Sequence, residues 1–363
     1  MTRDELQEHA AQRLAYSHRL LCQWATGTGK SNVVLKFLQK HPSFTCLILV
    51  PEQNNIENWE HEFTKFGVPM EYVRIICYAS LHKYRDTHWN LLVCDECPHT
   101  DTELKVDILR TITATYVLAL GAVVAEWELD TLNKLYGKFA ISNITLSKAI
   151  EMGILPQPSV RILHMMLDNE KRRNYHNGQM LTDAAMYKVF NDKVENAKAA
   201  FAEHPTDRNR DVLNHAGNRR KRFLGKMKVH AVKKCCEELE SRNKRFLCFC
   251  ASIPQAKQLG KDHAFTSKTP KTAKLLEKFN NHEIDSLYVV GKLIEGQNLK
   301  DIDCGIIGQI GGQERITVQM IGRIMRSEKP IVFIPIVDDT KDEWFLGTVT
   351  CNIPESYIKH YKL

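Results

Sequence analysis

The sequence predicts an α/β protein with two parallel-sheet domains and a helical insertion in the second. Two series of short, continuous apolar runs separated by helical segments support this, because such runs are typical of parallel strands buried on both faces. Pro156 and Pro158 separate the two series. Proline ends helices and extends the residue before it, so we expect residues 1–155 and 156–363 to form separate domains.

Each series contains five runs that we expect to be strands. Those of the first series are residues 19–24, 44–50, 73–78, 90–95 and 115–120. Those of the second are residues 159–165, 245–250, 285–291, 303–308 and 330–335. Residues from about 168 to 241 are polar, with helical spacing and little β character, and they predict the helical insertion after the first strand of the second domain.

Composition excludes several classes of protein. With 363 residues, of which 43% are hydrophobic and 26% charged, the chain can bury a large core. No run approaches the roughly 18 apolar residues of a membrane span, and Glu5 and Glu8 stand where a signal peptide would be apolar, so we expect a cytoplasmic protein without membrane contact. The eleven cysteines are odd in number and several lie in apolar runs, which favours reduced core thiols. A formal net charge of +7 permits a polyanionic partner without requiring one.

A glycine-rich loop, ATGTGKS at residues 25–31, follows the first expected strand and precedes a helical pattern. Its backbone N–H groups are expected to cradle the phosphates of ATP, through Thr26, Gly27, Thr28 and Gly29. Lys30 would reach the β and γ phosphates, and Ser31 would ligate Mg²⁺. Trp24 replaces the first glycine of the usual GxxxxGK[ST] pattern. A simple glycine turn does not explain why lysine and serine follow at once.

The stretch VCDECPHT can be interpreted in two ways. Cys94, Cys97 and His99 look like half of a zinc site, but a closed zinc site uses four ligands, and the chain has no second CxxC or HxxxH. Alternatively, Asp95 ends an apolar strand and holds Mg²⁺, while Glu96 activates the attacking water. We favour the second interpretation, because side-chain alternation turns Cys94 away from Asp95 and into the core.

ATGTGKS followed by DECPH resembles the ATPase motifs of superfamily 2 helicases in their DExH branch. The similarity extends over nearly the whole chain, which looks like a compact phage or UvsW-like helicase core. This resemblance implies two tandem RecA-like domains that hydrolyse Mg-ATP between them and move on or remodel nucleic acid. It also implies that His99 couples the nucleotide site to the nucleic acid.

Three further segments are similar to the nucleic-acid contacts of that family. They are LVPEQNNIENWEHEF with Pro51, YASL with Ser80, and RFLCFCASIPQAKQL with Ser252. Such residues contact the sugar-phosphate backbone and read no bases, so they leave DNA and RNA open. The resemblance favours DNA.

Two motifs near the C-terminus resemble the part of the family that completes the nucleotide site. In LIEGQNLKDID, Gly296 and Asn298 would face nucleotide and nucleic acid. QMIGRIMR matches Gln-x-x-Gly-Arg-x-x-Arg in full, and helical spacing puts Gln319, Arg323 and Arg326 on one face. The resemblance implies that these arginines stabilise transition-state charge on the γ-phosphate.

Departures from the family pattern leave alternatives open. The linker motif, usually Ser or Thr-Ala-Thr, falls on Gly121, Ala122 and Val123, so both hydroxyls that help couple hydrolysis to strand separation are missing. A nucleic-acid-stimulated ATPase clamp, or a motor subunit of a nuclease complex, is therefore the alternative to a helicase. Adenine recognition could fall to Gln7 or to Gln12.

A basic tract at residues 219–234 holds eight Lys or Arg in sixteen positions. It fits an electrostatic track for a phosphate backbone and a solvated helix face about equally well. A small-molecule kinase is disfavoured, because kinases have no second α/β lobe that ends in QMIGRIMR. We expect a monomer or a subunit of a replication, repair or nuclease assembly.

Overall fold

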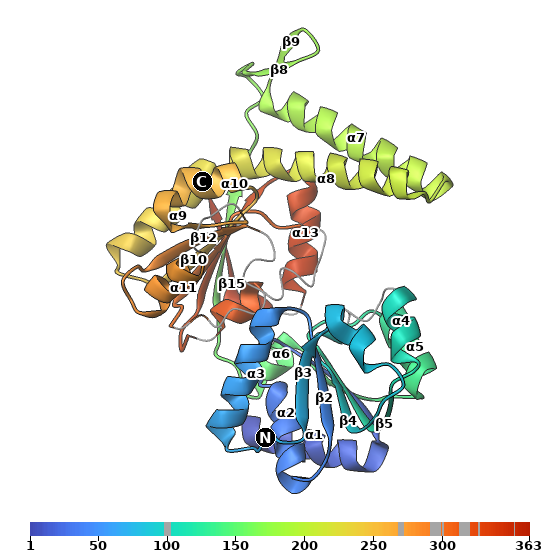
Figure 1. The fold of residues 1–363 in the computed structure, drawn as a ribbon. Coiled ribbons are helices and arrows are strands. Elements are labelled where there is room, and N and C mark those ends of the chain that lie inside the picture. Colours follow the sequence, from blue (N-terminus) through green and yellow to red (C-terminus); the bar gives the residue numbers. More distant parts are fainter. Residues whose placement is uncertain are drawn as a thin grey trace. The chain divides into compact units, whose positions relative to one another are not determined.

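The structure is a computed structural model that describes residues 1–97, 103–267, 272–290, 299, 301–311, 320–325, 327–351 and 353–363. The chain divides after Pro156 into two compact units, and each unit is built around its own parallel sheet with helices against it (Figure 1). This confirms the predicted α/β fold with two parallel-sheet domains.

The first unit contains a six-stranded sheet in the order β3-β2-β4-β5-β1-β6. Its strands are β1 Arg19–Trp24, β2 Cys46–Val50, β3 Val73–Cys77, β4 His88–Cys94, β5 Thr113–Gly121 and β6 Ala140–Ile144. The first five coincide with the five predicted runs. Strand β6 was not predicted, because its half-exposed, alternating residues AISNI on the edge of the sheet do not form a continuous apolar run.

Helices connect these strands and cover the sheet. They are α1 Arg3–Ser17, α2 Ser31–Lys40, α3 Gln53–Phe66, α4 Glu103–Leu109, α5 Glu126–Tyr136 and α6 Leu146–Glu151, with the 3-10 helix η1 Tyr78–Tyr84 after β3. A capping box starts α1: the Thr2 hydroxyl accepts from the Glu5 N–H at 3.2 Å, and the Glu5 carboxylate accepts from the Thr2 N–H at 2.8 Å.

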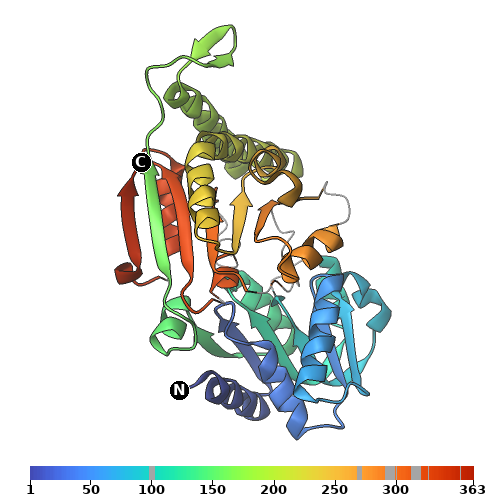
Figure 2. The same ribbon diagram turned by 90° about the vertical axis from the view of Figure 1, so that its left-hand side faces the viewer.

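The second unit contains a seven-stranded sheet in the order β11-β12-β10-β13-β14-β7-β15. Its strands are β7 Ser159–Met165, β10 Phe246–Cys250, β11 Ala264–Phe265, β12 Ser286–Val290, β13 Cys304–Ile307, β14 Ile331–Val337 and β15 Ile358–Lys362. Figure 2 shows β7, in green, between β14 and the edge strand β15. Two strands were not predicted: β11, which is two residues long, and β15, whose residues IKHYK are mostly exposed.

The predicted helical insertion begins with a small antiparallel hairpin, β8 Asn174–His176 and β9 Gln179–Leu181. Two long helices follow, α7 Asp183–Glu203 and α8 Asp207–Met227, which pack against each other (Figure 1). The next helix, α9 Val229–Ser241, packs Val232, Cys235 and Cys236 into the core beneath the sheet. The insertion therefore includes some β structure, and α9 at its end covers the sheet.

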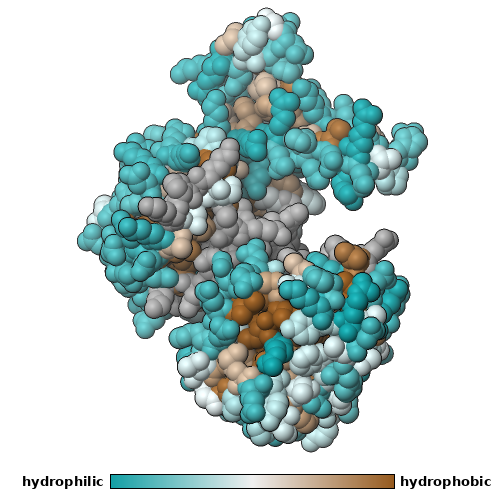
Figure 3. Space-filling model, viewed as in Figure 1, coloured by the Kyte–Doolittle hydropathy of each residue, from teal (hydrophilic) through white to brown (hydrophobic). Residues whose placement is uncertain are grey.

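The remaining helices of the second unit are α10 Ile253–Gly260, η3 Lys261–His263, α11 Thr272–Asn280, α13 Lys341–Thr350 and η5 Glu355–Tyr357. Hydrophilic residues cover most of the visible surface of α7, α8 and the hairpin (Figure 3). Among the described residues, no helix is long and apolar enough to cross a membrane.

Candidate nucleotide-binding site

The glycine-rich loop runs from the end of β1 at Trp24 to the start of α2 at Ser31. Gly27 and Gly29 have φ values of +91° and +81°, a left-handed conformation that favours glycine. A Cβ at Gly29 would lie 2.3 Å from Nε2 of Gln7, so the position also has no room for a side chain. The loop ends where the first N–H groups of α2 lack partners within the helix, which is the geometry that binds phosphate.

A buried glutamine supports the loop from behind. Gln7, in α1, is 2% exposed and its amide donates to the carbonyls of Thr28 at 3.2 Å and Gly29 at 3.1 Å. Gln12 is exposed and donates to Glu8 instead. Of the two glutamines that the sequence left open, Gln7 is the one that contacts the loop.

Two polar groups of the loop fit an anionic ligand. Lys30 donates from Nζ to the carbonyl of Trp24 at 3.0 Å, which keeps its ammonium at the loop. The hydroxyl of Thr26 is buried and has no hydrogen-bond partner within the described residues. An unsatisfied buried hydroxyl is costly, so this loop suits a ligand with phosphate oxygens.

Asp95 follows β4 at the same edge of the sheet, and several groups fix its position. Its N–H donates to Leu49 at 2.9 Å, and its carbonyl accepts from the Tyr78 hydroxyl at 3.0 Å. Oδ2 accepts from the indole N–H of Trp59 at 2.9 Å, while Oδ1 accepts from the Glu96 N–H at 3.1 Å. Trp59 of α3 and the Glu96 N–H therefore orient the carboxylate, while Tyr78 of η1 holds the backbone of Asp95.

Burial and nearby charges, including that of Lys30, act on the carboxyl group of Asp95. Burial, followed by the charge of Glu96, raises the pKa of Asp95 to about 6, while the Trp59 hydrogen bond and the charge of Lys30 oppose that rise. Strands β4 and β1 both pair in parallel with β5, which lies between them, so they end at the same edge of the sheet. Lys30, Ser31 and Asp95 are thus grouped at the carboxyl edge of this sheet.

Glu96 is partly buried and has a φ of +48°. A non-glycine residue in the left-handed region is uncommon, and such strain is often found at functional sites. His99, the predicted coupling residue, lies outside the described residues.

The two cysteines of VCDECPHT belong to the core. Cys94 and Cys97 are fully buried in the hydrophobic cluster of the first unit. Burial raises the pKa of the Cys94 thiol to about 12, whereas a zinc ligand is a thiolate. Within the described part of the chain, no group of three His, Cys, Asp or Glu side chains could hold a metal ion.

The three predicted nucleic-acid contacts also lie at the carboxyl edges of the sheets. Two of them are in the first unit and one is in the second. Pro51 follows β2 directly, and Ser80 lies in η1 after β3. In the second unit, Ser252 follows β10 and caps α10, with its hydroxyl accepting from the Gln255 N–H at 3.4 Å. The hydroxyl hydrogen of Ser252 is still free to donate, as a phosphate contact requires.

Part of the predicted arginine motif is described. Arg323 is partly buried in a helical stretch, residues 320–324, and Ile324 packs against β13, where a Cβ at Gly305 would lie 1.9 Å from Cδ1 of Ile324. Glycine at position 305 thus allows this helix to approach the sheet. Four other predicted site residues lie outside the described residues: Gly296, Asn298, Gln319 and Arg326.

Trp59 lies in the segment LVPEQNNIENWEHEF, but its contact with Asp95 was not predicted from the sequence. The two residues are 36 positions apart, on different elements, and nothing in the spacing indicates that they meet. Tyr78 was missed for the same reason.

Comparisons with known proteins show what the fold is similar to. The family model for the res subunit of type III restriction enzymes matches residues 1–77. The Pyrococcus furiosus Hef helicase domain is 13% identical and has a TM-score of 0.58, covering 94% of this chain and 96% of that one. The chain shares the fold of this helicase domain, and its two parallel sheets correspond to two RecA-like domains.

Two further solved structures share this fold. S. cerevisiae Dbp5 bound to RNA and ADP BeF3 is 12% identical, with a TM-score of 0.60 over 98% of this chain and 89% of that one. The type ISP restriction-modification enzyme LlaBIII bound to DNA is 14% identical, with a TM-score of 0.59 over 99% of this chain and 31% of that one. No curated protein matches by sequence. At these identities the similarity concerns the fold alone.

Proposed function

We propose that the protein is an ATP-dependent nucleic-acid translocase or helicase that hydrolyses Mg-ATP to move on or remodel DNA rather than RNA. The grouping of Lys30, Ser31 and Asp95 at one sheet edge, with the Lys30 charge acting on the Asp95 carboxyl, carries the proposal. The helicase-type fold supports it, and so does the nucleic acid bound to the two structural neighbours LlaBIII and Dbp5.

The chain's own residues fit Mg-ATP. The loop N–H groups and Lys30 would bind the phosphates, and Ser31 and Asp95 would hold Mg²⁺, an ion that prefers oxygen ligands. When bound, Mg²⁺ neutralises charge that develops on the phosphates. Trp59 orients Asp95 for this role, and Glu96 would position the attacking water and accept its proton.

Arg323 and Arg326, with Gln319, would complete the site from the second unit. Arginines delivered to the γ-phosphate stabilise transition-state charge and make hydrolysis depend on domain closure. Arg323→Ala should therefore bind ATP normally and lose about 10³-fold in turnover. Arg242→Ala is the matched control, because Arg242 is an exposed surface residue paired with Glu238. Wild-type hydrolysis in Arg323→Ala would contradict the assignment.

Hydrolysis rates measured in parallel with single-stranded DNA, duplex DNA and RNA test the proposal directly. Stimulation by DNA above that by RNA is expected, because the resemblance favours DNA. Stimulation by RNA alone would correct the substrate. Absence of stimulation by every nucleic acid would reject a nucleic-acid motor and favour a phosphate-loop enzyme for a small molecule.

A specific observation favours one alternative, an ATPase clamp or nuclease motor subunit that does not separate strands. Strand β5 lies between β4 and β1 and ends at Gly121, followed by Ala122 and Val123, so this part of the edge offers no hydroxyl. A strand-displacement assay beside the hydrolysis assay separates the two functions. DNA-stimulated hydrolysis without displacement supports the alternative.

A further inference from the structure

A basic groove of about 580 Å³ lies in the second unit, outside the predicted nucleotide site. Elements that contribute to its lining are the start of the hairpin, the end of α8, α9 and α10. Four of its eight lining residues carry basic side chains: Arg173, Lys226, His230 and Lys233. None of the eight is acidic. We call this feature the basic groove.

Close packing of α8 on α10 places Lys226 at the groove. A Cβ at Gly225 would lie 2.4 Å from that of Ala251, so only glycine allows this approach. Gln255 joins the two helices, because its amide donates to the Gly225 carbonyl at 2.9 Å and accepts from the Ala251 N–H at 2.6 Å. The next residue, Lys226, is thereby held beside α10, where Gln258 lines the same groove.

The structure places residues of the basic tract 219–234 in different environments. Arg220 and Lys228 are buried and have structural partners: Arg220 donates to Asn191 at 2.6 Å, and Lys228 donates to Asp342 at 2.8 Å. Lys226, His230 and Lys233 are exposed at the basic groove. The tract is therefore neither one continuous track nor one solvated helix face.

Positive charge at the basic groove is incompletely neutralised. Within the described residues, Lys226 and His230 make no ion pair, and the pair between Lys233 and Glu237, at 3.5 Å, is solvent-exposed and therefore weak. Arg173 pairs with Asp183 at the hairpin. These groups converge from several elements, as expected of a built anion site.

We propose that the basic groove binds the sugar-phosphate backbone of double-helical nucleic acid. That the occupant is a polyanion rests on the proposed function. The predicted contact Ser252 caps α10, and Gln258 lies on the same helix about 9 Å further along its axis, so the groove lies close to that contact. None of the eight lining residues is Phe, Tyr or Trp, so the groove offers no stacking platform of the kind that single-strand binders use. The hairpin and α8 thus extend the nucleic-acid contact beyond the helicase motifs.

Charge reversal tests the groove in the full-length chain. Lys226→Glu/Lys233→Glu changes two groove residues, and Lys193→Glu/Lys198→Glu is the matched control on exposed positions of α7. Each Lys→Glu lowers the net charge by 2, so both variants fall from +7 to +3. Fluorescence anisotropy would give the Kd of a labelled duplex at several salt concentrations, beside thermal melting to verify folding.

We expect the groove variant to bind the duplex about tenfold or more weakly at moderate salt, with the slope of log Kd against log salt reduced by about 2. The milder Lys226→Gln/Lys233→Gln should show a smaller loss in the same direction. The control should stay within about twofold of wild type, since it changes the same charge without touching the groove. Hydrolysis without nucleic acid should be equal in all variants.

Unchanged duplex affinity and salt slope in the groove variant would overturn the inference, as would an equal loss in the control. Loss of single-strand binding with duplex binding intact would also overturn it. If the groove variant instead lost only its affinity for polyglutamate, the groove would take an acidic protein segment. If the wild-type protein neither bound nucleic acid nor hydrolysed ATP faster in its presence, the proposed function itself would be rejected. If nucleic acid stimulated hydrolysis normally and the groove variant bound the duplex as tightly as wild type, only the groove would be rejected.

Discussion

Two lysines occupy the same local position in two parts of the molecule. Lys30 and Lys228 each stand at the N-cap of a helix, α2 and α9, with helical backbone angles and no side-chain capping bond. Lys30 is partly exposed and donates to the carbonyl of Trp24, whereas Lys228 is fully buried and donates to the Asp342 carboxylate. One charge stays available for an anion, and the other is neutralised in place.

The partners of Asp342 explain the difference. This buried carboxylate accepts from Lys228 at 2.8 Å, from the Gln309 amide at 2.8 Å and from the Val337 N–H at 3.2 Å. Burial lowers the pKa of Lys228, and Asp342 opposes that shift. The pair joins the start of α9 to α13, so Lys228 serves the fold. Within the described residues Lys30 makes no ion pair with a carboxylate, and it can serve a ligand.

Removal of Lys228 should produce the largest effect. We expect Lys228→Met to lower the free energy of unfolding by about 3–5 kcal/mol, because Asp342 is left buried without its counter-ion. Urea denaturation followed by circular dichroism measures this. Lys228→Met/Asp342→Leu should recover much of the loss, since no buried charge remains. A loss below about 1 kcal/mol in the single variant would show that the pair is not structural.

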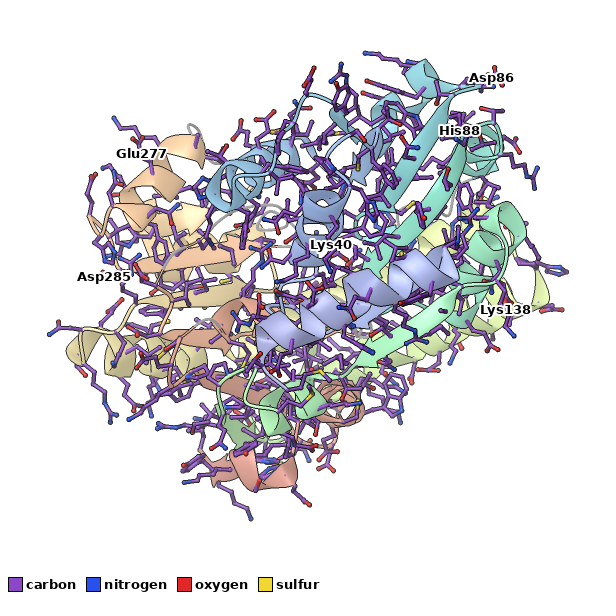
Figure 4. All side chains as sticks on the ribbon, turned by 90° about the horizontal axis from the view of Figure 1, so that it is seen from below. Lys40, Asp86, His88, Lys138, Glu277 and Asp285 are labelled. Atoms are coloured by element: carbon purple, nitrogen blue, oxygen red, sulfur yellow. The ribbon has the colours of Figure 1, made fainter. Side chains whose placement is uncertain are left out.

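Removal of Lys30 should act on hydrolysis and not on folding. Lys30→Ala is expected to lower the ATP hydrolysis rate about 10²–10³-fold, as for the loss of one preorganised donor in a phosphate site, with an unchanged melting temperature. The matched control is Lys40→Ala at the other end of α2, where Lys40 lies beside α1 (Figure 4) and pairs with Glu8. Equal rates in Lys30→Ala and Lys40→Ala would remove the functional distinction between the two lysines.

Trp59→Phe tests how Asp95 is held. The substitution keeps an aromatic ring in the buried position but removes the N–H that donates to Oδ2, a bond to a charged group worth about 1.5–3 kcal/mol. We expect hydrolysis to fall about tenfold and to require more Mg²⁺. Trp127→Phe, on the exposed face of α5, should leave both quantities unchanged. Full activity in Trp59→Phe would mean that the bond does not position Asp95.

The smallest effect on hydrolysis is expected at the end of β5. Val123→Thr adds a hydroxyl with little change of volume, so the hydrolysis rate should stay within about twofold of wild type. A gain in DNA strand displacement in Gly121→Ser/Val123→Thr would show that the missing hydroxyls limit unwinding. No gain, with hydrolysis intact, would place that limit elsewhere.

The buried strands could be predicted because each forms a short apolar run in the sequence. The bounds of β1 and β7 match the predicted runs. Edge strands such as β6 and β15 could not, because an exposed strand has mixed polarity and is stabilised by its pairing with a neighbour. The hairpin was not predicted, because five of its six paired residues are polar or exposed.

The sequence by itself determined the phosphate loop, because a loop that cradles an anion needs particular residues next to one another in the chain. It also determined the place of Asp95, since a strand carries its last side chain to the sheet edge. Only the tertiary structure decided which distant groups meet there: Gln7 behind the loop and Trp59 on the carboxylate. It alone decided that Lys228 is buried while Lys226 lines a groove. The physical reason is that burial and pairing depend on contacts between residues far apart in the chain, which no local pattern encodes.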